Sequence, residues 1–234
     1  MTKKIIYQAL IFILLLTLEA CHSSKFVLPA WLENHRQERL SLFKSENKHL
    51  VDQRYIILLG NSITEGFPVT KYFANQPVLN RGIVADHTGI EGHGILQRLK
   101  VSVFDCRPTK VFLMIGINDL ADKIFSPRQI AYGVKLIVQK IQAFNPGIKI
   151  YLQSTLLTTG KYAHLNPLVI TYNHFLEQTA AGLEISYINL HPHFANESGE
   201  LRSEYSRDGL HLTDAGYETW YYVILPFLSE TAKP

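Results

Sequence analysis

Short apolar segments alternate with longer amphipathic segments along most of this 234-residue chain. The apolar segments are three to six residues long and are bounded by glycine or polar residues, which is typical of buried strands. Alternation of such strands with helices favours a parallel sheet that helices cover on both faces. The predicted strands are Tyr55–Leu59, Val78–Asn80, Lys110–Ile115, Lys149–Gln153 and Ser186–Leu190.

Helical periodicity occupies the segments around these strands. Ser126 is expected to cap a helix that begins at Pro127, because serine is a good N-cap and proline is favoured in the first turn. The first helical segment is expected to lie across the outside of the domain. The predicted helices run from Pro29 to about Lys48, around Gly92–Phe104, from Pro127 to Phe144, from about Pro167 to Ala181, and from Thr213 to the end.

The N-terminus has the pattern of an export signal. Two lysines precede Ile5–Leu18, an apolar stretch too short to span a bilayer comfortably. Leu18-Glu19-Ala20-Cys21 then resembles a bacterial lipobox, in which the cysteine is lipidated, although Glu19 occupies a usually small or apolar position. We expect a leader over residues 1–20, a tether over 21–28 and one domain over 29–234. The expected location is the cell envelope, with a membrane anchor at Cys21; plain secretion and an uncleaved anchor are the alternatives.

Composition argues against several classes of protein. The net charge is only +3 and the basic residues are dispersed, so nothing suggests a nucleic-acid binder. With one of the two cysteines in the leader, no disulfide framework is expected, and Cys106 should pack as a small apolar group near the end of a helix. His191 and His193 lack an accompanying carboxylate or cysteine cluster, and no glycine-rich phosphate loop is present. We therefore expect neither a metal nor a cofactor.

Polar residues that suit acyl transfer follow the predicted strands. Ser62 comes directly after the first strand, and Asp208 and His211 lie three residues apart far downstream. Acyl transfer needs a hydroxyl nucleophile, a base and a carboxylate that orients the base. Asn118, after the third strand, could donate a hydrogen bond to an oxyanion. Taken singly, Ser62 could be a helix cap, Asn118 part of an Asx turn, and Asp208 part of a surface turn.

Together these motifs resemble those of the SGNH (GDSL-like) hydrolase family, from about Tyr55 to Tyr217. The similar blocks are Gly60-Asn61-Ser62, Gly116-Ile117-Asn118-Asp119, and Asp208-Gly209-Leu210-His211-Leu212-Thr213. The resemblance implies a three-layer α/β/α flavodoxin-like domain, with a parallel sheet of about five strands, and metal-free ester hydrolysis. It also implies that Ser62 is the nucleophile, His211 the general base and acid, and Asp208 the residue that orients His211. The Ser62 N–H and the Asn118 side chain would form two parts of the oxyanion hole.

The chain departs from the family pattern at two positions. Asn61 replaces the usual aspartate beside the serine, at a position outside the triad. Ala85 stands where the resemblance places the oxyanion-hole glycine, in Asn80-Arg81-Gly82-Ile83-Val84-Ala85-Asp86. The backbone N–H of Ala85 can serve as the third donor only if alanine adopts the dihedral angles that glycine adopts easily.

These observations predict a serine esterase that removes short acyl groups, most simply acetyl, from carbohydrates, since an exported hydrolase meets glycans. The first alternative is a phospholipid acetylhydrolase or lysophospholipase-type lipid esterase. An alternative from another class is a non-catalytic surface lipoprotein that binds glycans. The expected partners are a small-molecule or glycan ester and, through the anchor, a membrane; the sequence indicates no oligomeric state.

Overall fold

The structure of the protein, a computed structural model, describes residues 28–51, 54–74 and 76–229. The predicted leader, Cys21 and most of the predicted tether lie outside these ranges. Within the ranges, no helix has both the length and the apolar character needed to cross a bilayer.

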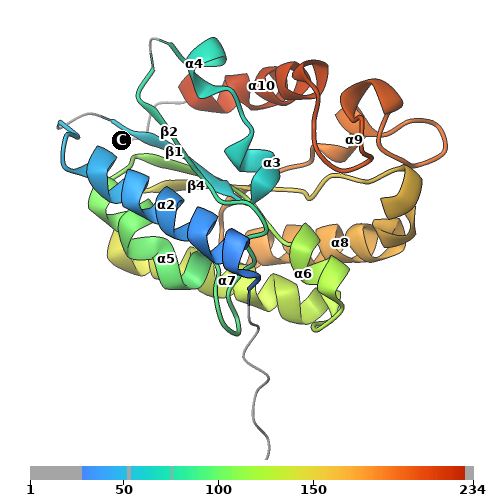
Figure 1. Cartoon of the computed structure of the whole chain (residues 1–234), viewed down its shortest axis with the longest axis horizontal. Coiled ribbons are helices and arrows are strands. Elements are labelled where there is room, and N and C mark those ends of the chain that lie inside the picture. Colours follow the sequence, from blue (N-terminus) through green and yellow to red (C-terminus); the bar gives the residue numbers. More distant parts are fainter. Residues whose placement is uncertain (1–27, 52–53, 75, 230–234) are drawn as a thin grey trace, which may run out of the picture.

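A five-stranded parallel sheet forms the middle layer, in the order β2-β1-β3-β4-β5 (Figure 1). The strands are β1 Ile56–Gly60, β2 Val78–Gly82, β3 Lys110–Met114, β4 Lys149–Gln153 and β5 Ser186–Ile188. These bounds confirm every predicted strand to within two residues, and with them the predicted three-layer α/β/α fold. The strand order reverses between β1 and β3, where open parallel sheets commonly bind their ligands.

Each strand contributes to two hydrophobic cores, because alternate residues point to opposite faces of the sheet. In β1, Ile57 and Leu59 belong to one core, and Ile56 and Leu58 belong to the other. Burial on both faces explains why the strand is a continuous apolar run. Figure 1 shows helices on both sides of the sheet. The first core includes α5 (Ile95–Ser102), α7 (Pro127–Phe144) and α8 (Asn166–Gly182), and the second includes α10 (Asp214–Ser229).

The long helices begin where local chemistry predicts. Ser126 caps α7 in a capping box with Gln129, and Pro127 lies in the first turn, as predicted. The helix predicted around Gly92–Phe104 is shorter than expected, because Gly92 and Gly94 have positive φ angles and precede its first turn. The remaining elements are α3 Ser62–Glu65, α4 Val69–Tyr72, η1 Phe104–Cys106, α6 Ile117–Asp122, η2 Gly160–Leu165, α9 His191–Phe194 and η3 Ser203–Tyr205.

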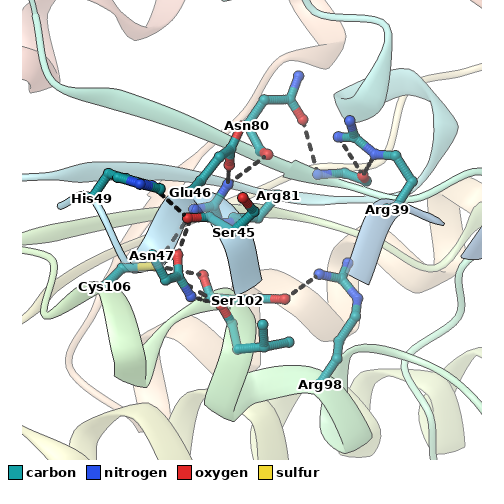
Figure 2. A network of polar contacts seen from close by, with 12 residues as sticks. Arg39, Ser45, Glu46, Asn47, His49, Asn80, Arg81, Arg98, Ser102 and Cys106 are labelled. Atoms are coloured by element: carbon teal, nitrogen blue, oxygen red, sulfur yellow. Dashed lines mark hydrogen bonds and ion pairs between the residues drawn. The ribbon is translucent and has the colours of Figure 1, made fainter. Parts of the chain in front are cut away.

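The helix α2 (Ala30–Asn47) is attached to the domain through a buried arginine (Figure 2). Arg81 on β2 is fully buried; its guanidinium pairs with Glu46, donates to Asn47 Oδ1 at 2.9 Å, and lies 4.6 Å from the centre of the Phe43 ring. The Arg81 side chain is 1% exposed, whereas that of Glu46 is 40% exposed, so the buried guanidinium depends on these contacts from the end of α2 for its polar partners.

Cys106 lies in the same cluster and is buried, as predicted. Its neighbours are more polar than the prediction of apolar packing allowed, since Sγ lies 3.2 Å from Asn47 Oδ1 and 3.7 Å from a guanidinium nitrogen of Arg81. Burial raises the pKa of the Cys106 thiol, so the protonated and unreactive form is favoured.

Candidate active site

Ser62 is the first residue of α3, directly beyond the end of β1. The helix cap is Asn61, whose buried side-chain oxygen accepts a hydrogen bond from the Ile63 N–H at 3.1 Å. The alternative in which Ser62 itself caps the helix is therefore wrong. Asparagine supplies the same capping oxygen as the usual aspartate, which gives a physical reason why the replacement at position 61 is accommodated.

A hydrogen-bonded chain connects Ser62 to a loop from the other end of the sequence. The Nε2 atom of His211 lies 3.0 Å from Ser62 Oγ, and its Nδ1 atom lies 2.6 Å from Asp208 Oδ2. With the proton on Nδ1, that nitrogen donates to the carboxylate, and Nε2 can accept the hydroxyl proton of Ser62. The three side chains that the sequence analysis singled out therefore meet in the order that a serine nucleophile requires.

Backbone hydrogen bonds hold the Asp208 carboxylate in place. Its Oδ1 atom accepts from the N–H groups of Leu210 and His211, at 2.9 and 2.8 Å. Partial burial alone would raise the pKa of Asp208, but the hydrogen bonds from the His211 ring and from these N–H groups outweigh it and hold the pKa well below its usual range. Gly209 allows the turn, because its φ angle is +89° and a Cβ there would collide with the Thr159 carbonyl.

Three segments meet around Ser62 because they follow neighbouring strands. Gly60 of β1 pairs with Gly82 of β2 and with Met114 of β3. After these strands come Ser62 at the start of α3, Ala85 in a loop, and Asn118 in the first turn of α6. The Asn118 Nδ2 atom donates to the Asp86 carbonyl at 2.8 Å, which places the Asn118 amide beside the Ala85 loop and leaves its second N–H available.

Ala85 adopts the left-handed conformation, with a φ of +55°. The sequence analysis required Ala85 to adopt a backbone conformation that glycine adopts more easily, and Ala85 does adopt it. Within the described residues, neither the Ala85 N–H nor the Ser62 N–H donates to a backbone carbonyl. Both groups are therefore available to an acceptor from outside the chain.

Two charged side chains that the sequence analysis did not single out, Glu65 and Arg98, form hydrogen bonds that hold these segments in place. Glu65 Oε2 accepts from the Val84 N–H at 2.7 Å, while Oε1 lies 2.9 Å from His35 Nε2 and 3.6 Å from Arg39 Nε. Arg98 donates to Asp86 Oδ2 at 2.7 Å and to the Gly60 carbonyl at 2.9 Å.

The sequence does contain a signal that Arg98 has a specific partner. It shares the buried face of α5 with Ile95, Leu99 and Ser102, where a charged residue needs a partner. Glu65 lies one helical turn after Ser62, but its partners come from two distant segments that only the fold brings near.

Other titratable side chains lie near the Ala85 and Asn118 segments. Asp119 is buried and accepts from the N–H and Oγ1 of Thr88, and burial raises the pKa of its carboxyl group. The ring of His93 lies 5.0 Å from that of His87, and Glu91 is exposed. Among the residues that the structure describes, no group of three histidine, cysteine or acidic side chains is placed to hold a metal ion, the His191 and His193 region included.

The candidate triad lies open to solvent. The side chains of His211 and Asp208 are 47% and 44% exposed. A cavity of about 760 Å³ includes both residues in its wall, together with the polar side chains of Ser203, Glu204 and Arg207. A hydrophilic molecule can therefore approach the His211 and Asp208 side chains from this cavity.

Comparison with known proteins gives one family and a set of similar folds. The model of the GDSL-like lipase/acylhydrolase family matches residues 58–219. No curated protein sequence matches the chain.

Three solved structures illustrate the similarity in fold. A protein from Streptococcus pneumonia, proposed to be a platelet activating factor, has a TM-score of 0.77 at 24% identity, over 85% of this chain and 94% of that one. A GDSL-like lipase from Bacteroides thetaiotaomicron has a TM-score of 0.72 at 21% identity, over 81% and 96% of the two chains. An acetyl xylan esterase has a TM-score of 0.61 at 17% identity, over 74% and 99%.

Proposed function

Because the chain belongs to the GDSL-like lipase/acylhydrolase family, and is thus an ester hydrolase of the SGNH type, we propose that it removes acetyl or other short acyl groups from carbohydrates through an acyl-enzyme on Ser62. The observation that carries the proposal is the hydrogen-bonded chain from Ser62 Oγ through the His211 ring to the Asp208 carboxylate.

In the proposed mechanism, His211 Nε2 takes the hydroxyl proton as Ser62 Oγ attacks the ester carbonyl carbon. The carbonyl π electrons move to the oxygen, which becomes an oxyanion. When the tetrahedral intermediate collapses, the ester C–O bond breaks and the alcohol leaves with the proton from His211. Water then attacks the acyl-enzyme with His211 again as base, which releases the carboxylic acid and returns the proton to Ser62. Asp208 keeps the imidazole in the tautomer that accepts at Nε2 and stabilises its charged form.

The proposed oxyanion hole consists of the Ser62 N–H, the Ala85 N–H and the Asn118 amide. Donors that are already in place when the negative charge develops lower the barrier without reorganisation. The hydrogen bond from Asn118 to the Asp86 carbonyl supports this assignment, because it holds the amide and the Ala85 loop in one arrangement.

A carbohydrate alcohol is favoured by the polar and open surroundings of the candidate triad. The cavity wall beside His211 carries Ser203, Glu204 and Arg207, which can hydrogen bond to hydroxyl groups. One protein of similar fold is an acetyl xylan esterase, which supports this choice of substrate class. The runner-up is an acetyl or short acyl phospholipid ester, favoured by the similarity to the streptococcal protein.

A labelling and substrate panel tests the proposal. A fluorophosphonate probe should add its mass to the peptide that contains Ser62, and Ser62→Ala should abolish both labelling and ester turnover while leaving the far-UV circular dichroism unchanged. Release of acetate should be fastest from acetylated xylo-oligosaccharides, compared with an acetylated glycerophospholipid and with p-nitrophenyl esters of increasing acyl length. Faster release from the phospholipid would support the runner-up instead. Absence of labelling and turnover would support the non-catalytic alternative.

We also propose export and lipid anchoring at Cys21, on the strength of the leader pattern in the sequence.

A further inference from the structure

The first turns of α2 carry an exposed tryptophan beside a cavity. Trp31 is 66% exposed, whereas Leu32, the next residue, is buried in the domain. A cavity of about 510 Å³ is lined by Trp31, Asn34, His35, Glu38 and Val84. An aromatic face and several hydrogen-bonding groups thus border one hollow.

One residue of the cavity wall is next in the chain to a residue of the candidate oxyanion hole. Val84 in its wall directly precedes Ala85, whose N–H is a proposed oxyanion donor, and consecutive Cα atoms are only about 3.8 Å apart. His35, also in the wall, lies 2.9 Å from Glu65, in the helix that begins with Ser62. Figure 1 shows the N-terminal end of α2 directed toward α3 and α6, at the end of the sheet where these loops meet.

The first half of α2 is held in a definite position relative to the active-site loops. Arg39 donates two hydrogen bonds to the Gly82 carbonyl, at 3.1 and 3.3 Å, and this contact is drawn in Figure 2. Together with the His35–Glu65 contact and the buried Arg81 at the other end, it fixes the helix against β2. Trp31 is therefore presented to solvent by an anchored helix.

We propose that this cavity is a subsite for a sugar unit in the alcohol part of the substrate, an inference that rests on the proposed carbohydrate esterase function. The C–H face of a pyranose ring is apolar and flat enough to pack on the indole of Trp31. Its hydroxyl groups are acceptors and donors, which suit the amide of Asn34 and the carboxylate of Glu38. A sugar seated here would be next to the acetylated unit whose carbonyl oxygen enters the oxyanion hole.

An exposed tryptophan can also mark contact with a lipid surface, but the neighbouring residues favour a glycan. Tryptophan at a membrane interface usually lies beside apolar or basic residues that enter the headgroup region. Here the residues that line the cavity beside Trp31 are Asn34, His35, Glu38 and a single aliphatic residue, Val84, with no lysine or arginine among them. The Glu38 carboxylate is repelled by the negative surface of an anionic membrane.

A selectivity ratio tests the subsite without depending on total activity. The ratio compares kcat/KM for an acetylated xylo-oligosaccharide with kcat/KM for p-nitrophenyl acetate, which has no sugar. Trp31→Ala should lower this ratio roughly three- to tenfold, the usual range for loss of one aromatic contact. Trp31→Phe, which keeps a flat ring, should lower it by about twofold or less. The control Tyr132→Ala removes an aromatic side chain with 56% exposure from α7 and should leave the ratio unchanged.

Fluorescence gives an independent binding readout, because the only other tryptophan, Trp220, is buried. In the Ser62→Ala protein, which leaves the ester intact, titration with the acetylated oligosaccharide should shift the emission to shorter wavelength. The same titration in Ser62→Ala, Trp31→Phe should give no shift. A shift produced by phosphatidylcholine vesicles and not by the oligosaccharide would overturn the proposal in favour of a lipid surface.

The possible outcomes distinguish failure of the subsite proposal from failure of the proposed function on which it rests. An active wild type whose selectivity ratio is unchanged by Trp31→Ala would refute the subsite and leave the carbohydrate esterase proposal intact. A wild type that hydrolyses p-nitrophenyl acetate but no acetylated glycan would refute both.

Discussion

The Asp208 carboxylate accepts hydrogen bonds on both of its oxygens, which governs how the candidate triad responds to pH. The pKa of Asp208 is lowered on folding, from about 3.9 in an unfolded chain. Its interactions therefore stabilise the fold above that value, and the contribution is lost as pH falls through the lower pKa of the folded state. Across the mildly acidic range Asp208 therefore remains an anion that can accept the hydrogen bond from His211 Nδ1.

Replacing Asp208 tests this assignment. We expect Asp208→Asn to lower kcat by about a thousandfold or more, because it removes the anion and favours the wrong imidazole tautomer. His211→Ala should cost at least as much. Steady-state kinetics at neutral pH provide the measurement. A variant that kept most of its turnover would show that another carboxylate orients His211.

The Asn118 amide is the side-chain donor in the proposed oxyanion hole. Asn118→Ala should lower kcat by about a hundredfold or more and change KM much less, as expected for a group that acts mainly in the transition state. The variant also loses the hydrogen bond to the Asp86 carbonyl, so its urea unfolding curve should be recorded as a control. A higher KM with unchanged kcat would identify Asn118 as a residue that positions the substrate.

The left-handed backbone of Ala85 makes a further prediction at this scale. Ala85→Gly should keep turnover close to wild type, because only the N–H is proposed to contact the oxyanion. It should also raise the free energy of unfolding by up to about 1 kcal/mol, since glycine adopts a φ of +55° without a steric penalty. Urea denaturation and steady-state kinetics measure the two effects. A large loss of activity would mean that the methyl group has a packing role.

At the scale of elements, α2 supports the catalytic loops from outside the sheet. Glu65 of α3 contacts His35 and Arg39 of α2 through one oxygen and the Val84 N–H through the other. We therefore infer that Glu65 is a positioning residue, which transmits the placement of α2 to the Ala85 loop.

Glu65→Ala should lower kcat by roughly tenfold with little change in KM, because the Val84 N–H loses its acceptor and the neighbouring oxyanion donor is less well oriented. Glu65→Gln keeps one acceptor oxygen and should recover part of kcat. The comparison requires kcat and KM for both variants, together with their thermal unfolding midpoints. Equal loss of stability with unchanged kcat in both variants would limit Glu65 to a structural role.

At the scale of the whole molecule, the place where α2 begins determines which end of the domain a lipid on Cys21 would hold near a membrane. The helix α2 begins at Ala30, at the active-site end of the sheet (Figure 1). Cys21 precedes Ala30 by nine residues, and such a segment spans at most about 30 Å when fully extended. A lipid on Cys21 would therefore keep the catalytic end of the domain close to the membrane surface.

If Cys21 is lipidated, the protein should fractionate with membranes and its N-terminal peptide should carry a diacylglyceryl mass. Cys21→Ser should release the protein from the membrane fraction, whereas Cys106→Ser should not, because Cys106 is buried within the domain. Mass spectrometry of the N-terminal peptide and membrane fractionation give the result. A soluble wild-type protein with an unmodified N-terminus would contradict the proposal and would point to Glu19 as the disruptive residue.

Local sequence patterns were sufficient to predict much of the architecture. The run Tyr55–Leu59 predicts β1 because a strand buried on both faces must be apolar at successive positions. Ser126 and Pro127 predict the start of α7 because both act on the backbone groups within one turn. The positions of Ser62, Asn118 and Asp208 after strands or in a tight loop could likewise be predicted, since they depend on short contiguous motifs.

Tertiary structure alone determined the contacts between residues that are far apart in the chain. The 3.0 Å approach of His211 to Ser62 joins residues 149 positions apart, and the packing of the sheet and loops sets that distance. Ala85 is held in a conformation that alanine rarely adopts by itself, so local propensity could not predict it. Arg98 and Glu65 acquire their roles only because folding brings the Gly60 carbonyl and the Val84 N–H, from distant segments of the chain, within reach. Periodicity and capping act within a few residues, whereas these contacts depend on how whole elements pack, and a single sequence does not display that directly.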